Sequence, residues 1–230
     1  MLLRRLPLRL VLLLALVAVV PGPALMAQEA AGSSARTAGP DLDRIRERAA
    51  GLDPLNSLVV SFRDSIVVEE YFGGMGPDVP ANVKSVSKTL LSALVGIAIE
   101  EGRIPGTETP LAELLPEAFE GIDDPDKLRV TLHDLLSMTT GLEGTSFGNY
   151  GAWVASDDWI EFALERPVVC ERGGECMTYS TGNSHLTSAI LTRATGMDTR
   201  AYFREVLFGP LGITARAWDR GPDGIYLGGN

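Results

Sequence analysis

The chain has 230 residues, a formal net charge of −10 at neutral pH and a composition that is 45% hydrophobic. So acidic a chain is poorly suited to binding nucleic acid or an anionic membrane, because their phosphates repel it. The length is sufficient for one sizeable hydrophobic core.

The first residues have the composition of a secretory signal peptide. Arginines precede a uniformly apolar run at residues 10–20, and Ala24-Leu25-Met26-Ala27 offers a cleavage site. The apolar run is too short to span a membrane comfortably. We therefore expect residues 1–27 to be a signal peptide, and the mature chain to be periplasmic or secreted without stable membrane insertion.

Residues 28–40 have the composition of a disordered linker, which leaves residues 41–230 as the folded domain. A charged surface helix is predicted first, over residues 41–52. Two β-rich runs follow, residues 57–62 and residues 66–72, and they predict an antiparallel hairpin around Arg63-Asp64-Ser65.

The tetrapeptide Ser85-Val86-Ser87-Lys88 opens a helix that is apolar almost all round, which predicts burial. Ser85, Lys88, Ser92 and Gly96 share one face of this helix. Burial lowers the pKa of a lysine, and a neutral amine beside a hydroxyl can activate it as a nucleophile. The alternative is that Ser85 only caps the helix while Lys88 extends to the surface.

The rest of the chain is predicted to be helical. Thr131 and Ser156 are expected to cap two of the helices. The expected helices are residues 111–118, 132–137, 157–165, 183–195 and 199–208. A Gly- and aromatic-rich loop covers residues 144–155, where Tyr150 or Trp153 could line a substrate cleft, whereas Trp159 is expected in the core.

Cys170 and Cys176 flank a Gly-rich turn, and in an exported protein such a pair predicts a disulfide loop. Zinc is a weaker alternative, because two cysteines and two distant histidines form no ligand cluster. We expect no metal and no cofactor. His133 and His185 are interpreted as structural, since the only acid at a suggestive spacing is Asp134, the immediate neighbour of His133.

Four segments together resemble the serine β-lactamase and penicillin-binding protein superfamily. The resemblance is greatest to its class C β-lactamase-like hydrolases, including 6-aminohexanoate-dimer hydrolases and family VIII esterases. The segments are residues 85–104, 130–142, 179–185 and 208–213. The resemblance implies an α+β fold of the β-lactamase/transpeptidase type, in which an antiparallel sheet lies beside an all-helical domain. The C-terminal strands and the third motif of that family are not found in this sequence, which resembles the N-terminal part of such a domain.

The resemblance implies roles for individual residues. Ser85 would be the nucleophile, and Lys88 with Tyr179 would carry its proton, with the choice of general base left open. Thr181 stands where the family has an asparagine, and Asn183 follows two positions later as a candidate substrate-binding residue. The replacement disfavours β-lactam recognition.

The sequence thus predicts an exported serine hydrolase that forms an acyl-enzyme with a small ester or amide. Alternatives are a DD-carboxypeptidase acting on a peptide, a β-lactamase, or a truncated relative that binds a partner without catalysis. The expected partners are small-molecule ester, amide or peptide substrates, and not nucleic acid.

Overall fold

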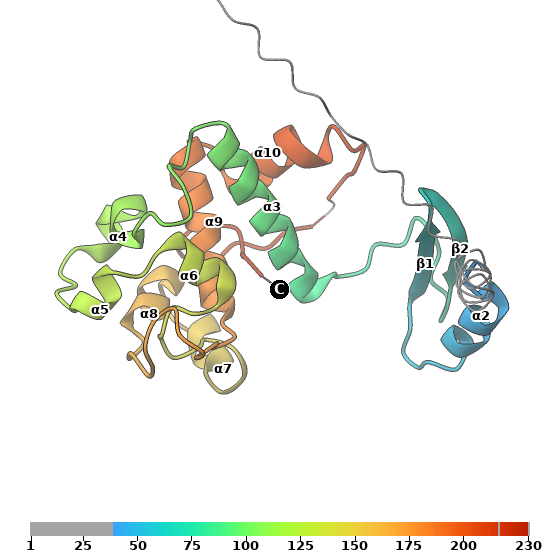
Figure 1. Cartoon of the computed structure of the whole chain (residues 1–230), viewed down its shortest axis with the longest axis horizontal. Coiled ribbons are helices and arrows are strands. Elements are labelled where there is room, and N and C mark those ends of the chain that lie inside the picture. The colour runs from blue at the N-terminus through green and yellow to red at the C-terminus, as the bar shows by residue number, and fades with distance from the viewer. Residues whose placement is uncertain (1–38, 216, 230) are drawn as a thin grey trace, which may run out of the picture. The chain divides into compact units, whose positions relative to one another are not determined.

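The computed structural model describes residues 39–215 and 217–229. The expected signal peptide and nearly all of the expected linker lie outside the described residues. The chain divides into a small unit that ends at Val79 and a larger unit that begins at Pro80 (Figure 1).

The small unit contains helix α2 (Leu42–Ala50) and the strands β1 (Ser57–Phe62) and β2 (Ser65–Tyr71). The strands pair antiparallel, which confirms the predicted hairpin. Arg63 and Asp64 form its two-residue turn, with φ angles of 50° and 61°. Such positive angles match the right-handed twist of the strands. The turn is therefore one residue shorter than predicted.

Among the described residues, all the helices and strands that belong to the larger unit are helices. The elements are η1 (Lys84–Val86), α3 (Ser87–Glu100), α4 (Leu111–Leu114), η2 (Pro116–Phe119), α5 (Pro125–Leu128), α6 (Leu132–Ser137), η3 (Phe147–Asn149), α7 (Tyr150–Val154), α8 (Trp159–Glu165), α9 (Thr181–Thr195), α10 (Thr199–Phe203) and η4 (Arg204–Phe208).

Three predicted helices differ in detail from the observed ones. The helix expected over residues 199–208 is α-helical only to Phe203 and continues as the π-helical turn η4. The helix expected over residues 111–118 breaks at Leu115, because Pro116 has no N–H to continue the α-helical hydrogen bonds. Helix α8 is capped by Asp158 and not by Ser156. The Asp158 carboxylate accepts hydrogen bonds from the backbone N–H groups of Ile160 and Glu161, which a serine hydroxyl two residues earlier does not reach.

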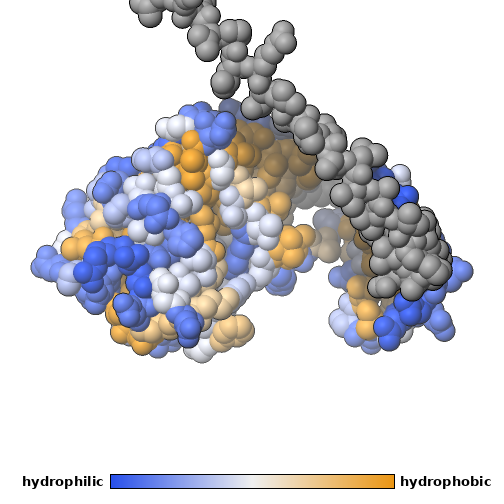
Figure 2. All heavy atoms as spheres, in the orientation of Figure 1, coloured by the Kyte–Doolittle hydropathy of each residue, from blue (hydrophilic) through white to orange (hydrophobic). Residues whose placement is uncertain are grey.

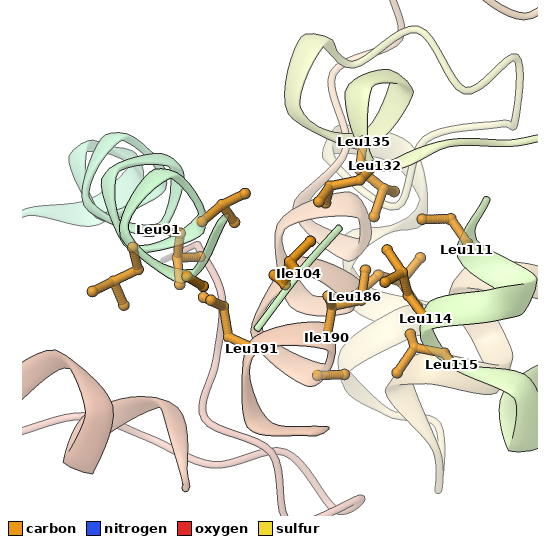
Figure 3. Packing of buried hydrophobic residues seen from close by; sticks show 14 of the residues in the cluster. Leu91, Ile104, Leu111, Leu114, Leu115, Leu132, Leu135, Leu186, Ile190 and Leu191 are labelled. Atoms are coloured by element: carbon orange, nitrogen blue, oxygen red, sulfur yellow. The ribbon is translucent and has the colours of Figure 1, made fainter. Parts of the chain in front are cut away.

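The hydrophobic core of the larger unit forms around α9. Leucine and isoleucine side chains from α3, α4, α6 and α9 point toward a common centre (Figure 3). Leu186 and Ile190 of α9 are fully buried there, as are Leu94 of α3 and Leu132 of α6. Burial of each such side chain contributes about 2 kcal/mol. The core therefore fixes α3 against α9 and α6.

Helix α3 is buried on one side only. Leu91, Leu94, Val95 and Ala98 face the core, whereas the small residues Ser92, Ala93 and Gly96 are exposed. The prediction that this apolar helix is buried is therefore correct for one face of α3 and wrong for the other. Helix α3 packs against α9 and η4 with its buried face, and Leu90, Ile97 and Ile99 lie partly buried against the same core.

Helix α6 begins with a buried capping box. The Thr131 hydroxyl accepts a hydrogen bond from Asp134 N, and the Asp134 carboxylate accepts one from Thr131 N at 2.9 Å. Arg172 pairs with the same carboxylate at 3.0 Å. The predicted cap is thus confirmed, and Asp134 also anchors a distant loop.

That loop is closed by the predicted disulfide between Cys170 and Cys176. Backbone hydrogen bonds tie it to the end of α6, from Gly173 N to Thr139 O and from Thr178 N to Met138 O, each at 2.9 Å. The loop therefore has a fixed position immediately before Tyr179.

The surface of the larger unit is mixed in hydropathy. Hydrophilic residues cover much of the face seen in Figure 2, with hydrophobic residues among them. No helix in residues 39–215 or 217–229 is long and apolar enough to cross a membrane.

Asp134→Ala should lower the free energy of unfolding by about 3 kcal/mol, because it leaves Thr131 N buried without an acceptor and removes the partner of Arg172. The measurement is urea denaturation followed by circular dichroism. Asp126→Ala is the matched control, because Asp126 forms an exposed pair with Arg129 worth less than about 1 kcal/mol. Equal losses in the two variants would contradict the buried role of Asp134.

Candidate active site

Ser85 and Lys88 lie at the start of α3. Ser85 sits in the short helix η1, which a hydrogen bond from Ser87 Oγ to Lys84 O at 2.8 Å joins to the first turn of α3. Lys88 Nζ donates to Ser85 Oγ at 3.2 Å. Ser85 is exposed and Lys88 is half-buried. The pair predicted from the tetrapeptide is therefore in hydrogen-bond contact, with its hydroxyl open to solvent.

Lys88 has a second polar partner, at the other end of the chain. Its Nζ donates a short hydrogen bond to the carbonyl oxygen of Gly229, which is buried. The C-terminal segment runs past α9 to reach the start of α3 (Figure 1). The lysine is thus held between two oxygen acceptors that fix the direction of its ammonium group.

Tyr179 reaches the pair from the loop before α9. It directly precedes Ser180, the N-cap of α9, whose hydroxyl accepts hydrogen bonds from Asn183 N and Thr145 N. Gly144 packs against the Tyr179 carbonyl so closely that a Cβ there would lie 2.7 Å from the oxygen. The backbone of Tyr179 is therefore fixed on both sides.

The Tyr179 ring faces Lys88, with Nζ 5.1 Å from the ring centroid. The pKa of Tyr179 lies below the ordinary value of 10.0, first because of a hydrogen bond with Ser85 and then because of a hydrogen bond with Lys88 and its charge. Desolvation opposes these effects. The structure thus brings together Ser85, Lys88 and Tyr179, whose catalytic roles remain predictions.

The space around this cluster is limited. A cavity of about 40 Å³ lies beside Lys88, lined in part by Ser92, Met138, Ser184 and Thr187, and it has room for a water molecule. A larger cavity of about 780 Å³ lies at the disulfide loop and includes none of the three clustered residues. We give it no role in the chemistry, because it contains no nucleophile with a base beside it.

The predicted substrate-binding residues are placed differently. Trp153 is fully buried, stacked 4.6 Å from Trp159 between ring centroids, so the prediction that it lines the cleft is wrong. Asn183 is also buried, with its amide directed to the Met138 sulfur at 3.8 Å. Tyr150 is partly buried against Trp153. The two indole rings form a small second hydrophobic cluster with Leu227. The expectation that Trp159 lies in a core is therefore confirmed.

One histidine has a partner that sequence spacing did not reveal. His185 Nε2 lies 2.8 Å from Asp223 Oδ2, and both side chains are buried. The Trp153 and Trp159 rings pack edge-on to the imidazole. His133, in contrast, is exposed on α6. His185 is thus engaged in a buried pair with Asp223 and in ring packing.

Two further residues near the cluster were missed from the sequence. Gly229 contacts Lys88 across 141 positions of the chain, and Phe147 lies 6.0 Å from Tyr179 between ring centroids. The Gly228-Gly229 dipeptide was a possible signal, because paired glycines permit close backbone approach. Phe147 is 86% exposed and carried no signal in its spacing.

The described residues contain no group of three or more His, Cys, Asp or Glu side chains arranged to hold a metal ion.

A curated relative at 29% identity is monacolin J acid methylbutanoyltransferase from Aspergillus terreus. The alignment covers 60% of this chain and 37% of that protein. The chain thus matches well under half the length of this relative.

Solved structures share the fold. A candidate β-lactamase from Bacteroides dorei DSM 17855 superposes with a TM-score of 0.61 at 23% identity, over 82% of this chain and 57% of the other. A candidate 6-aminohexanoate-dimer hydrolase from Bacillus anthracis gives 0.52 at 20% identity, over 70% and 44%. The α+β fold expected from the sequence is thereby confirmed. The Beta-lactamase family model matches residues 53–225, and the chain belongs to this family, within the serine β-lactamase/transpeptidase superfamily.

Proposed function

We propose that this chain is an exported serine hydrolase that cleaves a small ester or amide through an acyl-enzyme on Ser85. The observation that carries the proposal is the 3.2 Å contact between Lys88 Nζ and Ser85 Oγ, with Tyr179 against both. Proteins of this family are generally serine hydrolases or acyltransferases. The composition of residues 1–27 supports export.

The reaction begins when Ser85 Oγ attacks the substrate carbonyl carbon and passes its proton to Tyr179. The bond to the leaving group then breaks, and the leaving alcohol or amine takes that proton. Water next attacks the acyl carbon and gives a proton to Tyr179. The bond from the acyl carbon to Ser85 Oγ then breaks, and Tyr179 returns the proton to Ser85 Oγ. The Ser85 backbone N–H at the start of the helix is one donor for the tetrahedral oxyanion.

Tyr179 is the better candidate for the general base. As an ammonium group, Lys88 has three N–H donors, enough for Ser85 Oγ, Gly229 O and the Tyr179 oxygen. The hydrogen bond with Ser85, and then the hydrogen bond and charge of Lys88, stabilise the phenolate of Tyr179 and lower its pKa. The lysine then acts through its charge, while the phenolate accepts the proton.

The substrate ranking follows from Thr181, which stands where the family has an asparagine. Thr181 is buried and its hydroxyl lies 2.9 Å from Ser146 Oγ, so it does not offer the amide that would contact a β-lactam. Esters and simple amides therefore rank above β-lactams and DD-peptides. A second candidate is acyl transfer to an alcohol, which the methylbutanoyltransferase relative supports.

A fluorophosphonate probe should label the chain at Ser85, and Ser85→Ala should abolish the label. Ser87→Ala should keep it, because Ser87 Oγ donates to Lys84 O. Tyr179→Phe should slow labelling by about a hundredfold through loss of the base. Labelling is followed by gel fluorescence and mass spectrometry. Unchanged labelling of Ser85→Ala would overturn the nucleophile, and an unlabelled wild type would favour a non-catalytic binder.

The chain should turn over nitrophenyl esters faster than nitrocefin, because Thr181 replaces the amide side chain that favours β-lactams. Both reactions are measured by absorbance, with Ser85→Ala as the blank. An added alcohol should produce a new ester only if acyl transfer competes with water, as chromatography would reveal. Faster turnover of nitrocefin would reverse the ranking.

Tyr179 should ionise at lower pH than an ordinary tyrosine, as seen in the phenolate absorbance that Tyr179→Phe removes. Lys88→Gln should raise the pKa of Tyr179 only part of the way back, because it removes the hydrogen bond and charge of Lys88 but leaves the larger effect of the Ser85 hydrogen bond. A lowered pKa means that the phenolate stabilises the folded chain above the ordinary value, and that this contribution is lost as pH falls through the folded value. Tyr202, whose pKa is raised to about 12 by burial and Glu101, is the internal reference. An unchanged titration in Lys88→Gln would contradict the assigned coupling.

A further inference from the structure

The C-terminal segment, residues 218–229, forms a turn that is folded on itself. Leu227 N donates to Asp219 O at 2.8 Å, which closes the turn. Asp223 lies at its tip, where one carboxylate oxygen accepts a hydrogen bond from Ile225 N at 3.0 Å. The other carboxylate oxygen is left to bind elsewhere.

That oxygen binds α9. Asp223 Oδ2 lies 2.8 Å from His185 Nε2, and the two side chains are 4% and 0% exposed. An ionised carboxylate only accepts hydrogen bonds, so the proton lies on Nε2, which donates to Asp223. His185 Nδ1 is buried and has no hydrogen-bond partner among the described residues. An unpaired buried nitrogen lowers the stability of the fold, yet the pair with Asp223 is formed.

Other hydrogen bonds hold the remainder of the segment. Ser188 Oγ on α9 donates to Tyr226 O at 2.7 Å. Trp218 Nε1 donates to Leu227 O at 2.8 Å. The segment is therefore joined to itself and, through Ser188 and His185, to two buried positions of α9.

The end of the segment contacts the catalytic cluster. A Cβ on Gly228 would lie 2.0 Å from Ser184 O, and one on Gly229 would lie 2.6 Å from Lys88 Nζ. The two glycines thus pass between α9 and the lysine with no space for a side chain. The position of the Gly229 carbonyl on Lys88 depends on how this segment sits on α9.

We propose that the buried His185–Asp223 hydrogen bond is a latch that holds the C-terminal segment on α9 and so positions the Gly229 carbonyl to aim Lys88 Nζ at Ser85. His185 and Asp223 are positioning residues, because they act through Gly229. The effect on catalysis rests on the proposed function, whereas the effect on Lys88 itself does not.

The electrostatics of Asp223 agree with this role. Burial alone would raise its pKa, but the hydrogen bond from His185 and the N–H groups of Ile225 and Trp159 hold the pKa below its ordinary value. The carboxylate is therefore ionised and dependent on His185. Without that donor, a buried charge would favour release of the turn into water.

The test compares His185→Gln with His185→Leu in the 230-residue chain. Glutamine can keep an N–H donor near Nε2, while leucine fills similar space without one. Trace acetic anhydride modifies lysines in competition, and mass spectrometry gives the ratio of Lys88 to exposed Lys84. His185→Leu should raise that ratio about fivefold and slow fluorophosphonate labelling about tenfold. His185→Gln should restore both values to within about twofold of wild type.

Trp218→Phe is a second variant, in case His185→Leu does not fold. It removes the hydrogen bond to Leu227 O and part of the ring packing on Phe203 and Tyr226, at a partly buried site away from the buried pair. It should change both readouts in the same direction and by less. Circular dichroism verifies that each variant is folded.

Equal ratios of Lys88 to Lys84 modification in all folded variants would overturn the latch, whatever the labelling shows. A His185→Gln variant that behaves as His185→Leu does would also overturn it, because the hydrogen bond would then be irrelevant. A raised ratio in His185→Leu with no labelling of the wild type would support the latch and reject Ser85 as the nucleophile.

Discussion

Burial of the polar helix α9 is the constraint on which the larger unit depends. From Thr181 to Leu191 every residue of α9 is buried, although the run is rich in hydroxyl and amide side chains. Buried polar groups are tolerable only when they are hydrogen-bonded. Thr187 and Thr195 bond to carbonyl oxygens one turn back, and Ser188 bonds to the C-terminal segment. The helix is therefore a scaffold whose polar groups select particular neighbours.

Those neighbours are the parts of the site. The first turn of α9 fixes Tyr179 through Ser180, the apolar side of α9 holds α3 with Lys88, and His185 holds the segment that carries Gly229. Three separate stretches of chain therefore converge because each one completes the packing or hydrogen bonding of the same helix. Side chains held by such a rigid element lose little further entropy when they meet, here around Ser85.

The sequence allowed prediction of contacts between residues close in the chain, but not of contacts between residues far apart in it. The hairpin, the Thr131 cap, the disulfide and the Ser85–Lys88 contact all join residues close in the chain, where spacing alone constrains geometry. The burial of Trp153 was missed because an aromatic residue in a Gly-rich segment can face a cleft or a core with the same spacing. The His185–Asp223 pair joins positions 38 apart, and no periodicity relates a helix to a turn beyond the next helix.

The serine and lysine meet as soon as α3 forms its first turn, whereas the lysine meets Gly229 only after 141 positions of chain have folded. Contacts between distant positions require loop closure before they stabilise anything. A Ser85–Lys88 pair within an isolated helix would leave the ammonium free to rotate in water. The orientation of Lys88 is therefore a property of the assembled unit, acquired when the Gly229 carbonyl and the Tyr179 ring close around its ammonium group.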